Sequence, residues 1–147
     1  MSVNEIERVT DWEPNIVAFC CKWCSYSGAD LAGTSRLQYP PQLKIIKVPC
    51  SGRIDPHFVI KAFQRGADGV LVAGCHPGDC HYTTGNYYTR RRFLVVKRLL
   101  EYVGLDEDRF MVSWISSSEA LKFQEMAERI TSKVKELGPN RIMRDNL

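Results

Sequence analysis

The sequence predicts an α/β fold in a single domain. We expect a four-stranded parallel sheet of strand order 2-1-3-4 with helices on both faces, a flavodoxin/Rossmann-like arrangement. Three observations predict it. Short apolar runs alternate with amphipathic stretches along the chain. Residues 69–74 are apolar throughout, as in a parallel strand covered on both sides. The 147 residues, 44% hydrophobic and 25% charged, fit one globular domain.

The first part of the chain has the pattern of a strand, a helix and a second strand. Residues 15–20 read NIVAFC, an apolar run of strand length. A short helix is expected over residues 26–32, stopping at Gly33. Residues 44–48, KIIKV, are rich in β-branched side chains and predict the second strand.

A second helix and a third strand follow. Asp55 is a favourable helix N-cap, and Pro56 suits the first helical position because its missing N–H is not needed there. Gly66 is expected to end this helix. Residues 69–74 then form the third strand. These signals repeat the strand–helix unit that builds a parallel sheet.

The last third of the chain predicts a long helix, a strand and a final helix. The long helix should end at Gly104, the strand covers residues 110–115, and Ser116 with Glu119 has the spacing of a capping box. Gly138 is expected to end the final helix. The apolar residues at helical spacing in the long helix are Phe93, Val96, Leu99, Leu100 and Val103.

Charge and terminal patterns narrow the classes of partner. The net charge of +3 is too small to indicate a nucleic-acid binder. The polar N-terminus lacks a signal-peptide pattern, and no apolar run approaches the roughly 20 residues that span a bilayer. We therefore expect a cytoplasmic protein that binds no membrane. Residues 1–147 are expected to form one domain with a core over about 15–138, and the tail of residues 140–147 should be mobile or dock on a partner.

The six cysteines are the unusual part of the composition. Structural disulfides are rare in a reducing compartment, where clustered cysteines more often bind metal or carry out redox chemistry. All six follow or end the first three predicted strands, at the edge where α/β sheets collect their ligands. They are Cys20, Cys21 and Cys24 after the first strand, Cys50 after the second, and Cys75 and Cys80 after the third.

The spacing of the cysteines favours a shared metal centre. Cys21 and Cys24 form a CxxC pair, which lets two thiolates bind one centre. Adjacent residues of a strand point to opposite faces, so Cys20 is expected to pack in the core. His76 and His81 flank the last cysteine pair, and we expect hydrogen bonding or surface placement for them.

Three functions are compatible with these thiols. The first is electron transfer by one [2Fe–2S] cluster on four thiolates. The second is a thioredoxin-like dithiol oxidoreductase, which leaves Cys50, Cys75 and Cys80 unexplained. The third is a zinc-stabilised interaction module, because four thiolates also suit zinc. No Ser–His–Asp arrangement, Walker loop or full dinucleotide fingerprint is present, so no catalytic site, nucleotide or flavin is expected on this chain.

Five segments resemble those of a known family. They are residues 21–30 (CKWCSYSGAD), 35–41 (SRLQYPP), 50–55 (CSGRID), 66–70 (GADGV) and 74–86 (GCHPGDCHYTTGN). In these segments the chain resembles the delta subunit of methyl-viologen-reducing hydrogenase, an iron–sulfur protein of methanogenic archaea and some anaerobic bacteria. The likeness extends over nearly the whole chain.

The resemblance implies a role and a set of metal ligands. The family's subunit carries electrons from a hydrogenase, or in relatives a formate dehydrogenase, to the flavin-bearing subunit of heterodisulfide reductase. The flavin there bifurcates electrons in methanogenesis. The family's cysteines map onto Cys21, Cys24, Cys50, Cys75 and Cys80, five candidates for four positions on a [2Fe–2S] cluster. We favour Cys21 and Cys24 with two of the other three.

Overall fold

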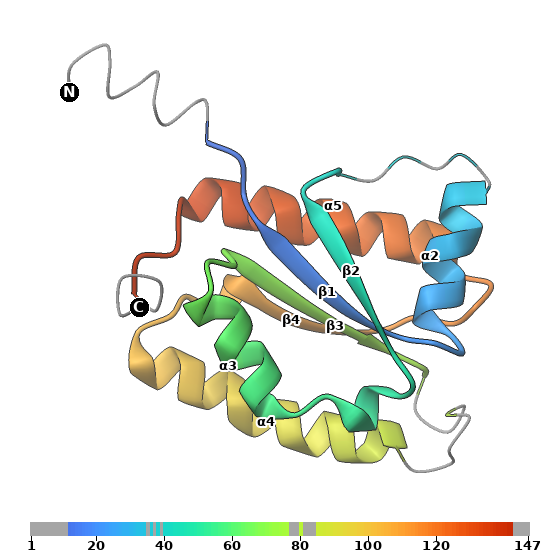
Figure 1. The fold of residues 1–147 in the computed structure, drawn as a ribbon, viewed down its shortest axis with the longest axis horizontal. Coiled ribbons are helices and arrows are strands. Elements are labelled where there is room, and N and C mark those ends of the chain that lie inside the picture. Colours follow the sequence, from blue (N-terminus) through green and yellow to red (C-terminus); the bar gives the residue numbers. More distant parts are fainter. Residues whose placement is uncertain are drawn as a thin grey trace.

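A four-stranded, wholly parallel sheet forms the centre of the molecule in the computed structural model, which describes residues 12–34, 36, 38, 40–76, 80 and 85–142. The strand order is β2-β1-β3-β4, so the predicted order 2-1-3-4 is confirmed. Figure 1 shows the strands running side by side with their carboxyl ends at one edge.

The helices and strands alternate along the chain as predicted. Short 3₁₀ segments η1 and η2 precede α3 and β4 and were not predicted. The elements in chain order are β1 (Ile16–Cys21), α2 (Ser25–Thr34), β2 (Leu43–Val48), η1 (Ser51–Arg53), α3 (Pro56–Gln64), β3 (Gly69–Gly74), α4 (Gly85–Val103), η2 (Glu107–Arg109), β4 (Phe110–Trp114) and α5 (Ala120–Leu137).

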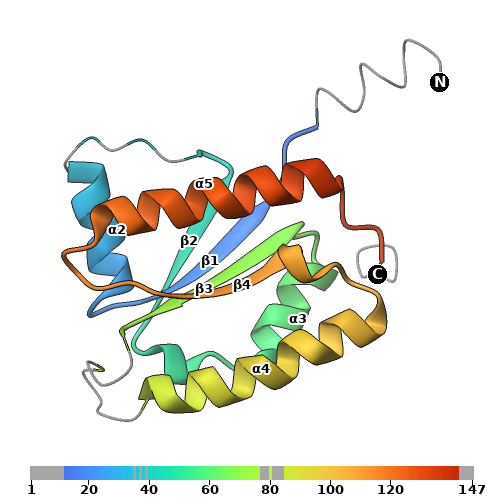
Figure 2. The same ribbon diagram turned by 180° about the vertical axis from the view of Figure 1, so that it is seen from behind.

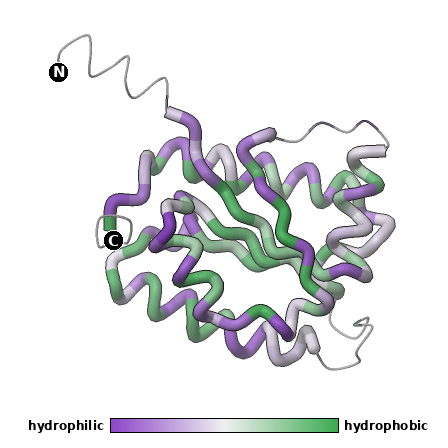
Figure 3. Tube along the Cα trace, viewed as in Figure 1, coloured by the Kyte–Doolittle hydropathy of each residue, from purple (hydrophilic) through white to green (hydrophobic). Residues whose placement is uncertain are grey.

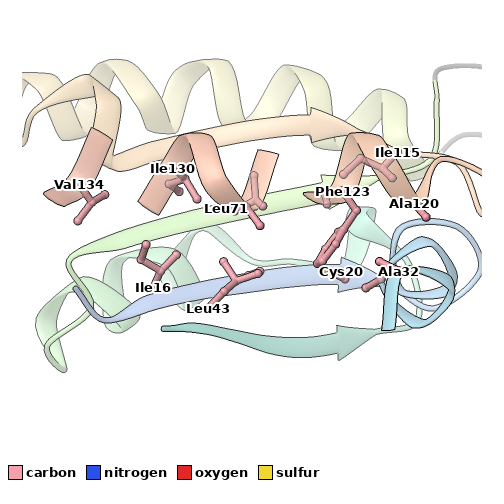
Figure 4. Close-up of a cluster of buried hydrophobic side chains, with 14 residues drawn as sticks. Ile16, Cys20, Ala32, Leu43, Leu71, Ile115, Ala120, Phe123, Ile130 and Val134 are labelled. Carbon is pink, nitrogen blue, oxygen red and sulfur yellow. The ribbon is translucent and has the colours of Figure 1, made fainter. Parts of the chain in front are cut away.

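Helices cover both faces of the sheet. Helices α2 and α5 lie on one face, and α3 and α4 lie on the other (Figures 1 and 2). Hydrophobic residues dominate β1 and β3 in the middle of the sheet (Figure 3). One core cluster, built around Phe123 and Ile130, packs beneath α5 (Figure 4). A second cluster, built around Phe63 and Phe93, packs beneath α3 and α4. Burial on both faces explains why β3 is apolar throughout.

A buried polar network closes the amino edge of the sheet, opposite the cysteines. The carboxylate of Asp68, only 1% exposed, accepts hydrogen bonds from the backbone N–H groups of Asn15 and Asn140, each at 2.9 Å. The guanidinium of Arg109 donates to the Asp68 carbonyl at 3.0 Å and to the Gly138 carbonyl at 2.8 Å. These bonds tie the start of β3 to the end of α5, so this edge serves stability.

The start of one helix and the end of another differ from prediction. Helix α2 was expected to stop at Gly33 but continues through it. The surroundings of Gly33 are open and its backbone does not adopt the left-handed conformation of a helix end. Helix α5 begins at Ala120, and only half of the capping box forms. The Glu119 carboxylate accepts from the Ser116 N–H at 3.0 Å, whereas the Ser116 hydroxyl bonds to Ser118.

The core face of α4 also differs from prediction. Phe93, Val96 and Leu100 are buried, but Leu99 and Val103 are each 55% exposed. Apolar residues occur on more than one side of this helix, so helical spacing alone could not identify the buried side. Asp55 does cap α3, accepting from the His57 N–H at 2.8 Å, and Gly66 and Gly104 follow their helices with φ of 110° and 103°.

Some sequence-based expectations fall outside the described residues. They concern the N-terminal pattern before residue 12, parts of the segment 35–41, His81, and the tail after residue 142. At the start of the tail, Asn140 is buried and its backbone N–H donates to Asp68, so the expectation that the tail is mobile or docks on a partner is wrong for this residue. In the part of the chain that is described, no helix combines the length and the apolar character needed to cross a membrane.

Candidate metal centre

The sheet register brings the three cysteine-bearing segments together. Cys20 of β1 pairs with Lys47 of β2 and Ala73 of β3, so the three strands end level with one another. Cys21 ends β1, and each neighbouring strand delivers a thiol within two residues of its last residue. The prediction that these cysteines gather at one sheet edge is therefore confirmed for the described residues.

Four of the sulfurs form two close pairs. The Sγ atoms of Cys21 and Cys75 lie 3.5 Å apart, although the residues are 54 positions apart in sequence. The Sγ atoms of Cys50 and Cys80 lie 3.6 Å apart, across 30 positions. Thus each pair joins two different loops, and neither pair is the CxxC pair that the sequence favoured.

The fifth thiol and the spacing between the pairs complete the site. Cys24 forms a hydrogen bond with Cys75. Charge on Cys21 raises the pKa of Cys50, so the two pairs are close enough to interact electrostatically. Among the described residues, no three or more His, Cys, Asp or Glu side chains are spaced to hold a single metal ion. The arrangement is two pairs of thiols with one more beside the first pair.

Ser25, at the start of α2, fixes the first pair. Its buried hydroxyl donates to the Ala73 carbonyl at 2.7 Å and accepts from the Cys21 N–H at 2.8 Å. Its own N–H donates to the Cys21 sulfur at 3.5 Å. The end of β1 is thereby joined to β3 through one side chain, and the exposed N–H of a helix start faces a sulfur.

The start of α4 fixes the second pair. The Gly52 N–H donates to the Cys50 sulfur at 3.4 Å. A Cβ at Gly85 would meet the Cys50 sulfur and would lie 3.2 Å from the Cys80 sulfur, so glycine is the residue that leaves both sulfurs in place. Thr89 donates to the buried Ser51 hydroxyl at 2.9 Å, which holds η1 against α4.

The acidity of the thiols differs across the site. A hydrogen bond from Cys75, followed by bonds from Ser25, lowers the pKa of Cys21 to about 5. The same contact with Cys21, together with burial, raises the pKa of Cys75. Burial raises the pKa of Cys50, and charge on Cys80 adds to the effect. Cys21 is therefore the thiol most readily ionised of these three, as a metal ligand requires.

Cys20 is separate from this group. It is fully buried in the cluster between the sheet and α5, among the side chains of Figure 4. Burial raises its pKa to about 12, so it remains protonated. The prediction that Cys20 packs as a small apolar residue is confirmed.

His76, next to Cys75, contacts a carboxylate of the segment before α5. Its Nε2 contacts Glu119 in a close ion pair. Hydrogen bonds from the Ser116 N–H and from His76 lower the pKa of Glu119 to about 2. The loop after β3 is therefore anchored to the start of α5, in agreement with the expected hydrogen-bonding role of His76.

Comparison with protein families identifies the family of this chain. Residues 16–138 match the model of the family described as methyl-viologen-reducing hydrogenase, delta subunit. The match spans the first strand to the end of α5.

The chain belongs to this family.

Several relatives of the delta-subunit family match over most of their length. The vhc iron–sulfur subunit of the F420-non-reducing hydrogenase of Methanococcus voltae is 54% identical, covering 88% of this chain and 90% of the relative. The iron–sulfur subunit of the F420-non-reducing hydrogenase of Archaeoglobus profundus is 50% identical, covering 88% and 94%. Both are named iron–sulfur subunits of a hydrogenase.

A delta-subunit segment also occurs inside a larger protein. One subunit of the ferredoxin:CoB-CoM heterodisulfide reductase of Methanosarcina mazei is 44% identical over 86% of this chain, but the match covers only 16% of that protein. The delta-subunit family is therefore linked to heterodisulfide reductase as well as to hydrogenase.

Three supporting residues of the delta-subunit site were not predicted from the sequence. In the sequence, Ser25 was noted only as part of a motif. Its position directly after the CxxC pair, at the start of a helix, could have indicated that it supports the site. Gly52 and Gly85 gave no local signal, because the need for glycine at each comes from packing between segments distant in sequence.

Proposed function

We propose that this chain binds one [2Fe–2S] cluster and carries electrons between a hydrogenase, or a formate dehydrogenase, and the flavin-bearing subunit of heterodisulfide reductase. The observation that carries the proposal is the presence of two close thiol pairs on three loops at one sheet edge. When bound, the cluster supplies a centre that takes up and releases one electron at a time.

The sulfur distances fit a two-metal cluster. Thiolates in tetrahedral positions about 2.3 Å from a metal lie about 3.8 Å from each other. The observed separations of 3.5 and 3.6 Å are close to that value. We therefore propose Cys21 with Cys75 on one iron and Cys50 with Cys80 on the other, with Cys24 as the fifth thiol beside Cys75.

The surrounding groups suit a negatively charged cluster. Backbone N–H groups of Ser25 and Gly52 already donate to sulfurs, and such bonds favour the added electron. The helix starts of α2 and α4 lie at the two pairs, where their dipoles favour negative charge. Gly85 leaves room for the Cys50 and Cys80 sulfurs. These residues would hold and orient the ligands without taking part in proton transfer.

The relatives support the proposed partners. Those that match along most of their length are named hydrogenase iron–sulfur subunits. The occurrence of a similar segment within a heterodisulfide reductase polypeptide supports placing this chain next to that protein. A protein that contacts both complexes can relay electrons between them.

The spacing of the thiols disfavours the two alternatives. A structural zinc site would gather four thiolates around one ion, whereas the two close pairs supply two thiolates for each of two metals. A thioredoxin-like mechanism uses only the two thiols of CxxC, which leaves Cys50, Cys75 and Cys80 without a role. A [2Fe–2S] cluster uses both close pairs, one on each iron.

The decisive experiment is anaerobic purification of the full chain and of single Cys→Ser variants. Iron, acid-labile sulfide and zinc are measured, and EPR spectra are recorded after dithionite reduction. We expect two irons and two sulfides per wild-type chain, loss or spectral change for the variants at Cys21, Cys50, Cys75 and Cys80, and a smaller change at Cys24. Cys20→Ser is the matched control and should keep the wild-type spectrum.

Two results would contradict the proposal. Stoichiometric zinc without sulfide would identify an interaction module. A metal-free chain with dithiol–disulfide activity that depends on Cys21 and Cys24 would identify an oxidoreductase. If all five variants keep an unchanged cluster, the ligand assignment fails.

A further inference from the structure

The outward face of α4 is unusually apolar. Seven of the thirteen large hydrophobic residues exposed in the described part of the chain lie on this one helix. Tyr102 is 90% exposed and Leu94 is 61% exposed. The solvent side of a surface helix is normally polar, so this concentration of exposed apolar side chains indicates a surface that becomes covered.

Helix α5 provides an internal comparison. It covers the opposite face of the same sheet and has 18 residues against 19 in α4. Its solvent side carries Glu125, Glu128, Arg129 and Lys133, and Leu121 is its one exposed large hydrophobic residue. Covering a sheet face therefore does not require an apolar outer side, and the composition of α4 needs another explanation.

The exposed residues of α4 form one stripe with a regular charge pattern. Tyr88, Arg91, Val95, Arg98 and Tyr102 are spaced three and four residues apart, so they share one side of the helix. We call this set the α4 stripe. At about 1.5 Å per residue it extends for roughly 20 Å. Apolar and cationic positions alternate along it.

The cations of the stripe lack carboxylate partners within the described residues. Helix α4 carries five basic residues and a single acidic one, Glu101. The one ion pair in the described part of the chain joins His76 and Glu119, at another place. Arg91 lies over the Tyr88 ring at 5.2 Å, and Arg92 is engaged by the Gly52 and Ile54 carbonyls. No carboxylate of the described residues forms an ion pair with Arg91 or Arg98, which suits both to contact carboxylates of another protein.

The stripe is continuous with the candidate metal centre. Tyr88, at its first position, also lines a groove of about 820 Å³ whose other walls include Cys50, Arg53 and Phe58. Helix α4 itself begins at Gly85, against the Cys50 and Cys80 sulfurs. A protein covering the stripe would therefore be brought next to the second thiol pair.

We propose that the α4 stripe and the adjoining groove form the docking surface for a protein partner whose own surface combines apolar side chains with Asp and Glu. The inference rests on the proposed electron-transfer function, because it places a partner beside the Cys50 and Cys80 side of the cluster. A second copy of this chain fits poorly, since pairing two stripes would bring Arg91 and Arg98 of each copy together. A nucleic acid would leave the apolar positions unmatched.

The test uses zero-length cross-linking of the native complex. The tagged full-length chain is purified anaerobically from its own host with its accompanying subunits and treated with a carbodiimide, which joins amines to carboxylates. The variant Arg91→Lys/Arg98→Lys keeps the charge and supplies two amines on the stripe. We expect mass spectrometry to find these lysines joined to Asp or Glu of one other protein of the complex, with no such links from Lys133 on α5.

Charge reversal provides the quantitative arm. Arg91→Glu/Arg98→Glu should lower the association rate with the separately isolated partner protein by about tenfold or more at low salt, and should remove most of its salt dependence. Arg129→Glu/Lys133→Glu makes the same change of charge on the opposite face and should leave the rate unchanged.

The outcomes separate this inference from the proposed function. The docking surface is wrong, while the function stands, if the complex forms but its cross-links come from α5. The same holds if the two charge-reversal variants have the same association rate. Links between two copies of this chain, or co-purified nucleic acid released by Arg91→Glu/Arg98→Glu, also overturn it. If the wild-type chain purifies with no other protein, both proposals fail.

Discussion

Replacing Gly52 by alanine tests the packing that supports the second thiol pair. A Cβ at Gly52 would lie 2.7 Å from the carbonyl oxygen and 3.0 Å from the Cα of Gly85, the first residue of α4. Ordinary contacts begin at 3.4 Å, so η1 and the start of α4 would have to separate by at least about 0.7 Å. The obstacle is backbone, so a change of rotamer cannot relieve it. The backbone of Gly52 itself accommodates alanine, because its φ is not left-handed.

The size of the effect follows from this displacement. Sites of this kind work only when their groups are held within about 0.5 Å of the required geometry. The overpacking should cost about 1–3 kcal/mol of folding free energy. Displacement of the loop that carries Cys50 should weaken metal binding by about 10–100-fold, as is typical for residues that support metal ligands. We expect a clear loss of iron and sulfide per chain and a lower urea midpoint.

Gly33→Ala is the matched control for this experiment. Among the described residues, apart from its chain neighbours and the backbone of its own helix, no atom lies within 4 Å of a Cβ at Gly33, which is inside α2. Alanine there should leave the iron content unchanged and raise stability by about 0.5–1 kcal/mol, because alanine favours the helix. Iron, sulfide, EPR and urea unfolding are measured for both variants. A Gly52→Ala protein with the full cluster, the wild-type EPR spectrum and the wild-type midpoint would refute the packing argument.

Three further predictions follow from side chains around and opposite the site. Ser25→Ala leaves the Cys21 N–H and the Ala73 carbonyl without their partner and should cost about 1–3 kcal/mol and shift the reduction potential, whereas Ser27→Ala should leave the potential unchanged. Asp68→Ala removes two charge-assisted hydrogen bonds and should cost about 3 kcal/mol in urea unfolding, against about 1 kcal/mol for Asp55→Ala. Glu119→Gln should have a lower urea midpoint than wild type near neutral pH, and the difference between the two midpoints should become smaller as pH falls.

The sign for Glu119 comes from its lowered pKa. Its folded-state pKa of about 2 lies below the ordinary value of 4.5, so its contribution is fully present above that ordinary value and is lost as pH falls toward 2. The midpoints are compared in metal-free protein, because acid releases iron and sulfide. Equal reduction potentials for Ser25→Ala and Ser27→Ala would contradict the first prediction. Equal losses of folding free energy in Asp68→Ala and Asp55→Ala would contradict the second. The third is contradicted if the difference in urea midpoint between Glu119→Gln and wild type does not change with pH.

The elements and the location of the site were predictable because their signals are local. Apolar runs identified the strands, and Asp55 and Gly66 marked the ends of α3. Alternation of side chains along a strand correctly separated Cys20 from Cys21. Helix boundaries at Gly33 and Ser116 were misjudged, because glycine can continue a helix where space is open and a capping sequence can form only part of its bonds.

The sequence by itself determined that thiols meet at one edge of a parallel sheet, since strands that run in the same direction bring the residues after them to the same side. Only the tertiary structure decided which thiols touch. Cys21 is 3.5 Å from Cys75, which is 54 positions away in sequence, because β1 and β3 are adjacent and Ser25 joins their ends. The outward side of α4 was likewise decided by packing, because a helix with apolar residues on two sides can bury only one against the sheet.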